Sequence, residues 1–315
     1  MADMPHRQLG GLSVSVVGLG CNNFGRRVDL EGTRAVVDAA LGAGINFLDT
    51  ADIYGGGGGS EELLGHVLKG RRDQVVLASK FGMDMGEKGP LVRPRGSADY
   101  IRVAVEGSLK RLQTDVIDLY QYHRPDGETP IEETLDALDE LVKEGKVRYI
   151  GCSNFSAREL YDASDASAKR RFAGFVSLQN EYSLLKREIE KDVIAACEEL
   201  GVGVLPYFPL ASGLLTGKYR RGEDAPEGTR LHGRPEVAKD ATFDRLEAAQ
   251  KFAEERGVTL LDVAISGLAA QPMVASVIAG ATKPEQVQAN AAALRWTPTE
   301  ADLEELDRIF PTPRG

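Results

Sequence analysis

Four residues of this chain have side chains that could move a proton or hold an oxygen: Asp49, Tyr54, Lys80 and His123. A tyrosine has an ordinary pKa of about 10, which is too high for ready proton release near neutral pH. A lysine ammonium beside it favours the phenolate and should lower that pKa. An aspartate can supply the counter-charge that a buried lysine needs, and a neutral histidine can hydrogen-bond a carbonyl oxygen.

This set of residues favours protonation of an oxygen that is becoming an alkoxide. Reduction of a carbonyl by hydride fits that requirement, with a nicotinamide as the donor. Positioned acid–base catalysis contributes typically ~10²–10⁴-fold, so the four residues alone would not supply the whole acceleration.

The four residues can act together only if the fold brings successive strand ends to one place. Short runs rich in Val, Ile, Leu and Phe alternate with amphipathic segments, and most lack the alternation of a half-solvated sheet. This pattern is typical of parallel strands buried on both faces. The predicted strands cover residues 16–20, 46–50, 75–81, 117–123, 147–154, 175–182, 202–206 and 274–279.

Helical patterns lie between these strands, and Ser60 is expected to cap the second helix. The predicted helices cover residues 31–41, 60–68, 99–113, 131–143, 157–168, 188–200, 244–255 and 300–309. Eight strand–helix units predict an α/β protein with a closed (β/α)8 TIM barrel, in one domain over residues 1–315. The active site of such a barrel lies at the carboxyl ends of its strands.

Two segments depart from the strand–helix alternation. Residues 8–15 read as a hairpin with a Gly-Gly turn, which could plug the bottom of the barrel. Residues 217–242 form a long polar loop after the seventh strand, and such loops are usually functional lids or disordered. Neither GxGxxG nor GxxxxGK[ST] occurs, so a nucleotide would bind without either standard phosphate loop.

Composition narrows the class of protein. The 315 residues are 42% hydrophobic and 27% charged, with a formal net charge of −10. Without a basic stripe, nucleic acid is not an expected partner. No stretch reaches the ~18 apolar residues of a membrane span. Three separated cysteines, Cys21, Cys152 and Cys197, indicate a reducing compartment and no metal site, so we expect a cytoplasmic protein, whose oligomeric state stays open.

Several motifs together resemble the aldo-keto reductase superfamily over nearly the whole chain. They are residues 46–54 (NFLDTADIY), 59–65 (GSEELLG), Lys80, 118–125 (DLYQYHRP), 145–154 (GKVRYIGCSN), 205–218 (LPYFPLASGLLTGK) and 278–290. The resemblance implies an NADP-dependent reductase of small carbonyl compounds. Tyr54 would be the general acid, Lys80 and Asp49 its tuning pair, and His123 the residue that orients the carbonyl.

The resemblance also implies where an extended nicotinamide dinucleotide would bind. Ser153, Asn154 and Gln179 match residues that hold the carboxamide, and Tyr207 matches the ring on which the nicotinamide stacks. Along the pyrophosphate we expect Phe208, Pro209, Leu210, Ala211, Ser212, Gly213, Leu215, Lys218 and Arg230. At the adenosine end we expect Gly280, Thr282, Lys283, Gln286 and Asn290.

Gln286 stands where the family usually has the arginine that grips the 2′-phosphate, and Lys283 is the expected substitute. NADPH is therefore the expected cofactor, with NADH possible. The predicted pocket wall consists of Asn22, Asn23 and Phe24, beside Tyr54 and His123.

Two other interpretations stay open. A nicotinamide-binding regulator of the same fold, like the potassium-channel β-subunits, would turn over slowly. A lyase that forms a Schiff base on Lys80 would not need the dinucleotide residues.

Overall fold

Eight parallel strands form the centre of the molecule. The computed structural model describes residues 4–232 and 240–312. The strand order is β10-β3-β4-β5-β6-β7-β8-β9. The strands are β3 Val17–Gly20, β4 Phe47–Asp49, β5 Val76–Phe81, β6 Ile117–Tyr122, β7 Val147–Ser153, β8 Phe175–Gln179, β9 Gly203–Val204 and β10 Val277–Gly280.

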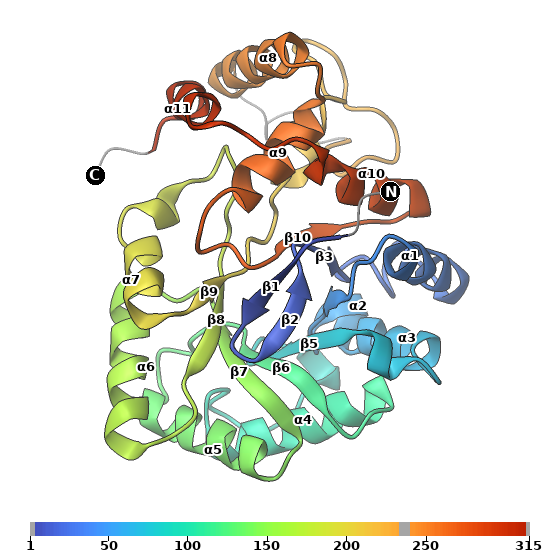
Figure 1. Cartoon of the computed structure of the whole chain (residues 1–315). Helices are drawn as coiled ribbons and strands as arrows, with labels where there is room; N and C mark the ends of the chain where they lie inside the picture. The colour runs from blue at the N-terminus through green and yellow to red at the C-terminus, as the bar shows by residue number, and fades with distance from the viewer. Residues whose placement is uncertain (1–3, 233–239, 313–315) are drawn as a thin grey trace.

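Backbone hydrogen bonds between the two outermost strand segments close this sheet. Ala275 N donates to Val204 O at 2.9 Å, and Ile278 N donates to Pro206 O at 3.1 Å. The closed sheet with helices around it confirms the predicted (β/α)8 TIM barrel (Figure 1).

Ten helices of eight or more residues lie in the described part of the chain. They are α1 Leu30–Gly42, α3 Gly59–Val67, α4 Ala98–Leu112, α5 Ile131–Lys143, α6 Ala157–Arg170, α7 Val193–Leu200, α8 Asp240–Glu255, α9 Leu260–Ala269, α10 Pro284–Ala292 and α11 Glu300–Ile309. Within the described residues, no helix combines the length and apolar character needed to cross a bilayer.

Four details of the helices differ from the sequence predictions. The segment 188–200 divides into a short 3₁₀ turn, Glu188–Glu190, and α7. The helix expected from residue 244 begins at Asp240, and α9 and α10 had no predicted counterpart. Ser60 is not a cap: it lies inside α3, where its hydroxyl donates to Cys21 O at 2.9 Å.

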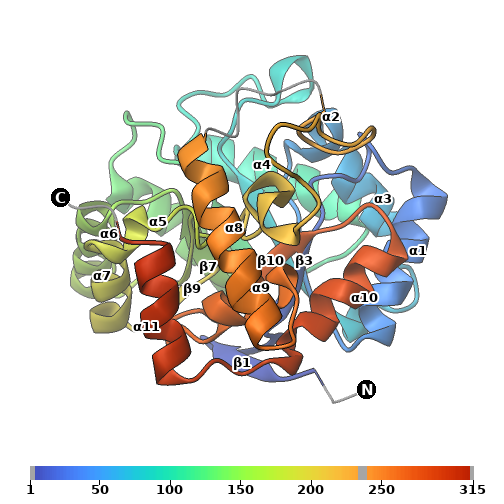
Figure 2. The same ribbon diagram turned by 90° about the horizontal axis from the view of Figure 1, so that it is seen from above.

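The predicted hairpin is present, with β1 His6–Leu9 paired to β2 Leu12–Ser15. Leu9, Leu12 and Val14 pack with Phe47 and Leu119 of the barrel interior. In Figure 2, β1 lies at one end of the barrel and the short helix α2 (Tyr54–Gly57) lies at the other. The hairpin thus covers the end of the barrel remote from the predicted active-site residue Tyr54.

Candidate active site

Apolar and polar side chains share the inward-facing positions of neighbouring strands. Successive residues of a strand point to opposite faces, so every second residue points into the barrel. Phe47 and Leu119 pack with the hairpin near the bottom. Asp49 and Gln121 stand two residues further along the same strands and are buried among polar groups. The register of the strands thus places a polar layer above an apolar one.

Lys80 lies between Tyr54, the predicted acid, and Asp49, which balances the charge of Lys80. Its Nζ lies 2.6 Å from Asp49 Oδ2 and donates to Thr50 O at 2.8 Å. The same ammonium lies 3.4 Å from Tyr54 Oη and 4.9 Å from the centre of its ring. Lys80 is fully buried. The structure therefore brings three of the four sequence-predicted residues into one hydrogen-bonded chain.

Two glutamines complete the support of Asp49. Gln179 Nε2 donates to Asp49 Oδ1 at 2.9 Å, and Gln121 Nε2 donates to the same oxygen at 3.1 Å. The sequence reading missed Gln121, although it stands two residues before His123 and so shares its strand face. The two glutamines thus hold Oδ1 of the Asp49 carboxylate, while its Oδ2 contacts Lys80.

His123 stands beside Tyr54 at the end of β6. The two ring centres are 5.9 Å apart and the rings are nearly perpendicular. Its backbone is held on both sides, because His123 N donates to Phe81 O and Asn154 Nδ2 donates to His123 O. Its buried Nδ1 has no hydrogen-bond partner among the described residues.

Burial and the Lys80 charge set the protonation states of the two rings. Burial lowers the pKa of His123 well below its ordinary value, and the charges of Lys80 and Arg124 add to that effect. Burial raises the pKa of Tyr54, and the lowering by Lys80 only partly offsets the rise. The net shift is thus opposite to the lowering expected from the sequence. His123 is neutral and Tyr54 protonated near neutral pH.

Lys80 itself keeps its proton in this buried setting. Burial works to lower the pKa of Lys80, but the opposing effects of Asp49 and Tyr54 outweigh it and raise the net value. A charged ammonium therefore stands beside the Tyr54 oxygen.

Four glycines, residues 55–58, connect Tyr54 to α3. Gly55, Gly56, Gly57 and Gly58 all have positive φ, from 71° to 97°. A Cβ on Gly55 would lie 2.5 Å from Ser60 N, so this position has no room for a side chain. These left-handed residues set the position at which Tyr54 leaves the barrel rim.

The residues predicted to hold a nicotinamide carboxamide lie beside His123. Ser153 Oγ donates to Gln179 O at 2.6 Å, and Asn154 has a positive φ of 62°. Tyr207 Oη donates to Asn154 Oδ1 at 2.9 Å, and the Tyr207 ring is half-buried. An aromatic face is therefore available at the barrel mouth, next to Asn154.

The segment predicted to follow a pyrophosphate has an unusual backbone. Phe208, Ala211, Ser212 and Gly213 have positive φ, and the last three begin the 3₁₀ segment Ala211–Thr216. Consecutive left-handed residues turn N–H groups toward one side, which suits an anion. A Cβ on Gly213 would meet Lys218 Nζ at 2.9 Å. This backbone and its lysine fit a diphosphate.

The other predicted residues of this segment lie around that backbone. Pro209 and Leu215 are buried, whereas Leu210 is partly exposed. The guanidinium of Arg230 lies 5.2 Å from the Phe208 ring centre, so part of the long loop folds back over the segment. Residues 233–239 of the predicted loop lie outside the described residues, and its last three residues belong to α8.

The predicted adenosine end lies at the start of α10. Lys283 is exposed and is the N-cap of that helix, where the helix dipole favours an anion. Gln286 Oε1 accepts from Thr282 N at 2.7 Å, so this glutamine is already used within the turn. Gly280 is exposed and Asn290 is buried.

The predicted pocket wall is only partly available. Asn22 is partly exposed, and Asn23 is buried with its Nδ2 donating to Ala281 O at 3.3 Å. Phe24 has no exposed surface and packs in the apolar core, so the structure leaves no part of its ring for a substrate.

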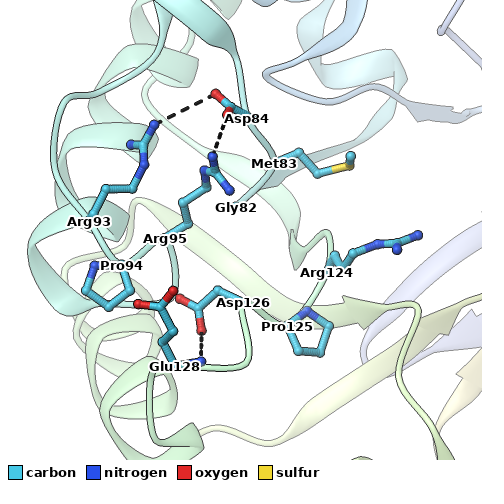
Figure 3. A pocket seen from close by; sticks show the side chains of 10 residues that line it. All are labelled: Gly82, Met83, Asp84, Arg93, Pro94, Arg95, Arg124, Pro125, Asp126 and Glu128. Atoms are coloured by element: carbon cyan, nitrogen blue, oxygen red, sulfur yellow. Dashed lines mark hydrogen bonds and ion pairs between the residues drawn. The ribbon is translucent and has the colours of Figure 1, made fainter.

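A cavity of about 370 Å³ adjoins the ends of β5 and β6 (Figure 3). Its lining begins at Gly82, directly after Phe81, and includes Arg124, directly after His123. The sequence reading assigned no role to these residues.

Comparisons with known proteins show which family this chain is similar to. The model of the Aldo/keto reductase family matches residues 16–310. The Bacillus subtilis oxidoreductase YrpG is 39% identical over 313 residues, covering 97% of this chain and 95% of the relative. The aldo-keto reductase yakc [NADP(+)] of Schizosaccharomyces pombe is 34% identical, covering 96% and 90%. A probable voltage-gated potassium channel subunit beta of Oryza sativa subsp. japonica is 35% identical, covering 94% and 92%.

Proposed function

Because the chain belongs to the aldo/keto reductase family of nicotinamide-dependent oxidoreductases, we propose that it reduces aldehydes or ketones to alcohols with NADPH. The observation that carries this proposal is the buried chain Asp49–Lys80–Tyr54 with His123 beside it. It offers one proton donor and one neutral hydrogen-bonding ring at the same place.

NADPH, when bound, supplies the hydride that the carbonyl carbon receives. Tyr54 gives its phenolic proton to the carbonyl oxygen as that oxygen gains charge. The ammonium of Lys80, at 3.4 Å, stabilises the phenolate left behind, and Asp49 keeps Lys80 in place. His123 is neutral, so a ring N–H of His123 can donate a hydrogen bond to the substrate oxygen without competing as an acid.

Ser153, Asn154 and Gln179 would hold the carboxamide, and Tyr207 would support the nicotinamide ring. The segment 208–213, with its four residues of positive φ, and Lys218 would take the pyrophosphate. Lys283, exposed at the N-terminus of α10, would pair with the 2′-phosphate, which supports NADPH over NADH.

Steady-state assays with each cofactor test this proposal. With 4-nitrobenzaldehyde as substrate, we expect oxidation of NADPH and a KM for NADPH lower than for NADH. Lys283→Met should raise the KM for NADPH roughly tenfold, since a charge-assisted contact contributes about 1.5 kcal/mol or more. Its KM for NADH should stay within about twofold.

The exposed Lys251 is a matched control, because Lys251→Met removes a lysine of α8 that pairs with Glu255 and with no other residue that the structure describes. Equal use of NADPH and NADH by the wild type would contradict the role of Lys283. No oxidation of either cofactor would contradict the reductase itself.

A second candidate function is a nicotinamide-binding regulatory subunit. The similarity to the rice protein named as a probable potassium channel subunit beta favours it. Such a protein would bind NADPH and oxidise it slowly, so the rate of a single turnover separates the two functions.

A further inference from the structure

Arg124 is a cation without a counter-charge at the mouth of the candidate site. It follows His123 directly in the chain and is exposed. It makes no ion pair or hydrogen bond with any residue in the ranges 4–232 and 240–312. An arginine without a partner beside a reaction centre is free to bind an anion from solution.

Apart from Glu128, the other charged groups around the same cavity already have partners. Arg93 and Arg95 both pair with Asp84, at 3.8 and 2.7 Å. Asp126 accepts hydrogen bonds from the backbone N–H groups of Gly96, Glu128 and Thr129. In Figure 3 the Arg124 side chain extends away from Asp84, Asp126 and Glu128. Arg124 is thus the arginine of this cavity that remains available to bind an anion.

The surroundings of Arg124 place its charge near the reacting groups. Tyr207 Oη donates to Asn154 Oδ1, and Asn154 Nδ2 donates to the backbone O of His123, so Asn154 links Tyr207 to the backbone of the residue that precedes Arg124. The charge of Arg124 contributes to the lowered pKa of His123. Burial raises the pKa of Tyr207, and Arg124 opposes that rise. Glu181, which pairs with Tyr207 across a β-bridge, is exposed and makes no ion pair with Arg124.

Apart from its effect on the His123 pKa, a cation at this place has no charged partner on a neutral carbonyl compound. The guanidinium is planar and offers two parallel N–H donors, which match a carboxylate. The chain carries a net charge of −10, which would otherwise repel anionic substrates. We propose that Arg124 determines substrate specificity and that the preferred substrates are aldehydes or ketones that carry a carboxylate. This inference rests on the proposed carbonyl reduction, and the carboxylate itself takes no part in the chemistry.

A pair of substrates that differ only in this charge tests the proposal. We would measure kcat/KM with NADPH for 4-carboxybenzaldehyde and for its methyl ester. The wild type should prefer the carboxylate roughly tenfold or more, as expected for a charge-assisted bidentate contact. In Arg124→Met the ratio of the two values should fall close to one, whereas Arg124→Lys should keep part of it.

Arg93→Met is the matched control, because it removes an arginine of the same cavity while Arg95 still pairs with Asp84. Its substrate ratio should equal that of the wild type. A wild-type ratio near one, or an equal loss of ratio in Arg93→Met and Arg124→Met, would overturn the proposal.

Salt and direct binding give readouts that do not depend on the variant's turnover. Because Arg124 is exposed, the preference for the carboxylate should weaken between about 0.05 and 0.5 M salt, as screening increases. Calorimetric titration of the protein saturated with NADP⁺ should show benzoate binding that Arg124→Met loses. Reduction of the ester without preference for the carboxylate overturns this inference alone. Absence of reduction of every aldehyde overturns the proposed function and this inference with it.

Discussion

At the scale of single residues, burial decides which protons are present. Tyr54 and Lys80 lie in a water-poor layer, where Asp49 holds the lysine charged and burial keeps the phenol protonated. The same burial makes His123 neutral. The resting site therefore already holds the proton that carbonyl reduction consumes.

These protonation states predict the pH dependence of the reaction. Reduction needs protonated Tyr54, so its rate should fall only as pH rises through the Tyr54 pKa, which burial raises above the ordinary value of about 10. His123 needs to be neutral. Because its pKa is lowered, any loss of rate in acid should occur well below pH 6.5, which is about the ordinary pKa of a histidine. We expect kcat for reduction to be flat from about pH 6.5 to about pH 9. A loss centred near neutral pH would contradict these states.

Individual residues of the site differ in how far the sequence reveals them. Asp49, Tyr54, Lys80 and His123 could be predicted because unusual residue types stand at successive strand ends. The direction of the Tyr54 pKa shift could not, since it depends on how burial compares with one nearby charge. Gln121 is an uncharged polar residue in an apolar run. Only the structure shows that it is a second donor to Asp49.

At the scale of elements, the path of the chain between β4 and α3 positions the acid. Four successive glycines with positive φ lead away from Tyr54, and a Cβ on the first would meet α3 while one on the last would meet Arg111. This run also explains the wrong prediction for Ser60. The chain enters α3 through Gly58, which leaves Ser60 inside the helix to bond Cys21 O.

Alanine at two neighbouring glycines should separate crowding from backbone strain. Gly55 and Gly56 have similar φ, 71° and 77°, so each change carries a left-handed cost of about 1–2 kcal/mol. A Cβ on Gly55 would also lie 2.5 Å from Ser60 N, whereas one on Gly56 meets nothing within 4 Å. Gly55→Ala should therefore be less stable than Gly56→Ala in urea unfolding, and its kcat should fall because Tyr54 shifts. Equal stability and kcat for the two variants would contradict this account of the turn.

At the scale of the whole molecule, the barrel separates stability from chemistry. The hairpin packs against an apolar layer at one end, and the groups proposed to transfer the proton lie at the other. The barrel could be predicted from the repeat of buried runs and helices. The helices α9 and α10 could not be predicted from an amphipathic pattern, because nearly every residue of α9 is buried and only Val287 and Asn290 of α10 are.

This separation predicts that a change in the hairpin affects folding alone. Leu9 is 1% exposed, and truncation of a buried leucine costs about 2–5 kcal/mol. Leu9→Ala should lower the free energy of unfolding by that amount and leave kcat unchanged below its melting temperature. A reduced kcat in a fully folded Leu9→Ala sample would show that the two ends of the barrel are coupled.

The most direct test of the central claim is a single turnover of protein loaded with NADPH and mixed rapidly with excess 4-nitrobenzaldehyde. The account predicts fast oxidation of NADPH by the wild type and loss of at least about 99% of that rate in Tyr54→Phe, with NADPH binding retained. Fast oxidation by both proteins would contradict the role of Tyr54. Tight binding with almost no oxidation by the wild type would contradict the reductase and favour the regulatory subunit.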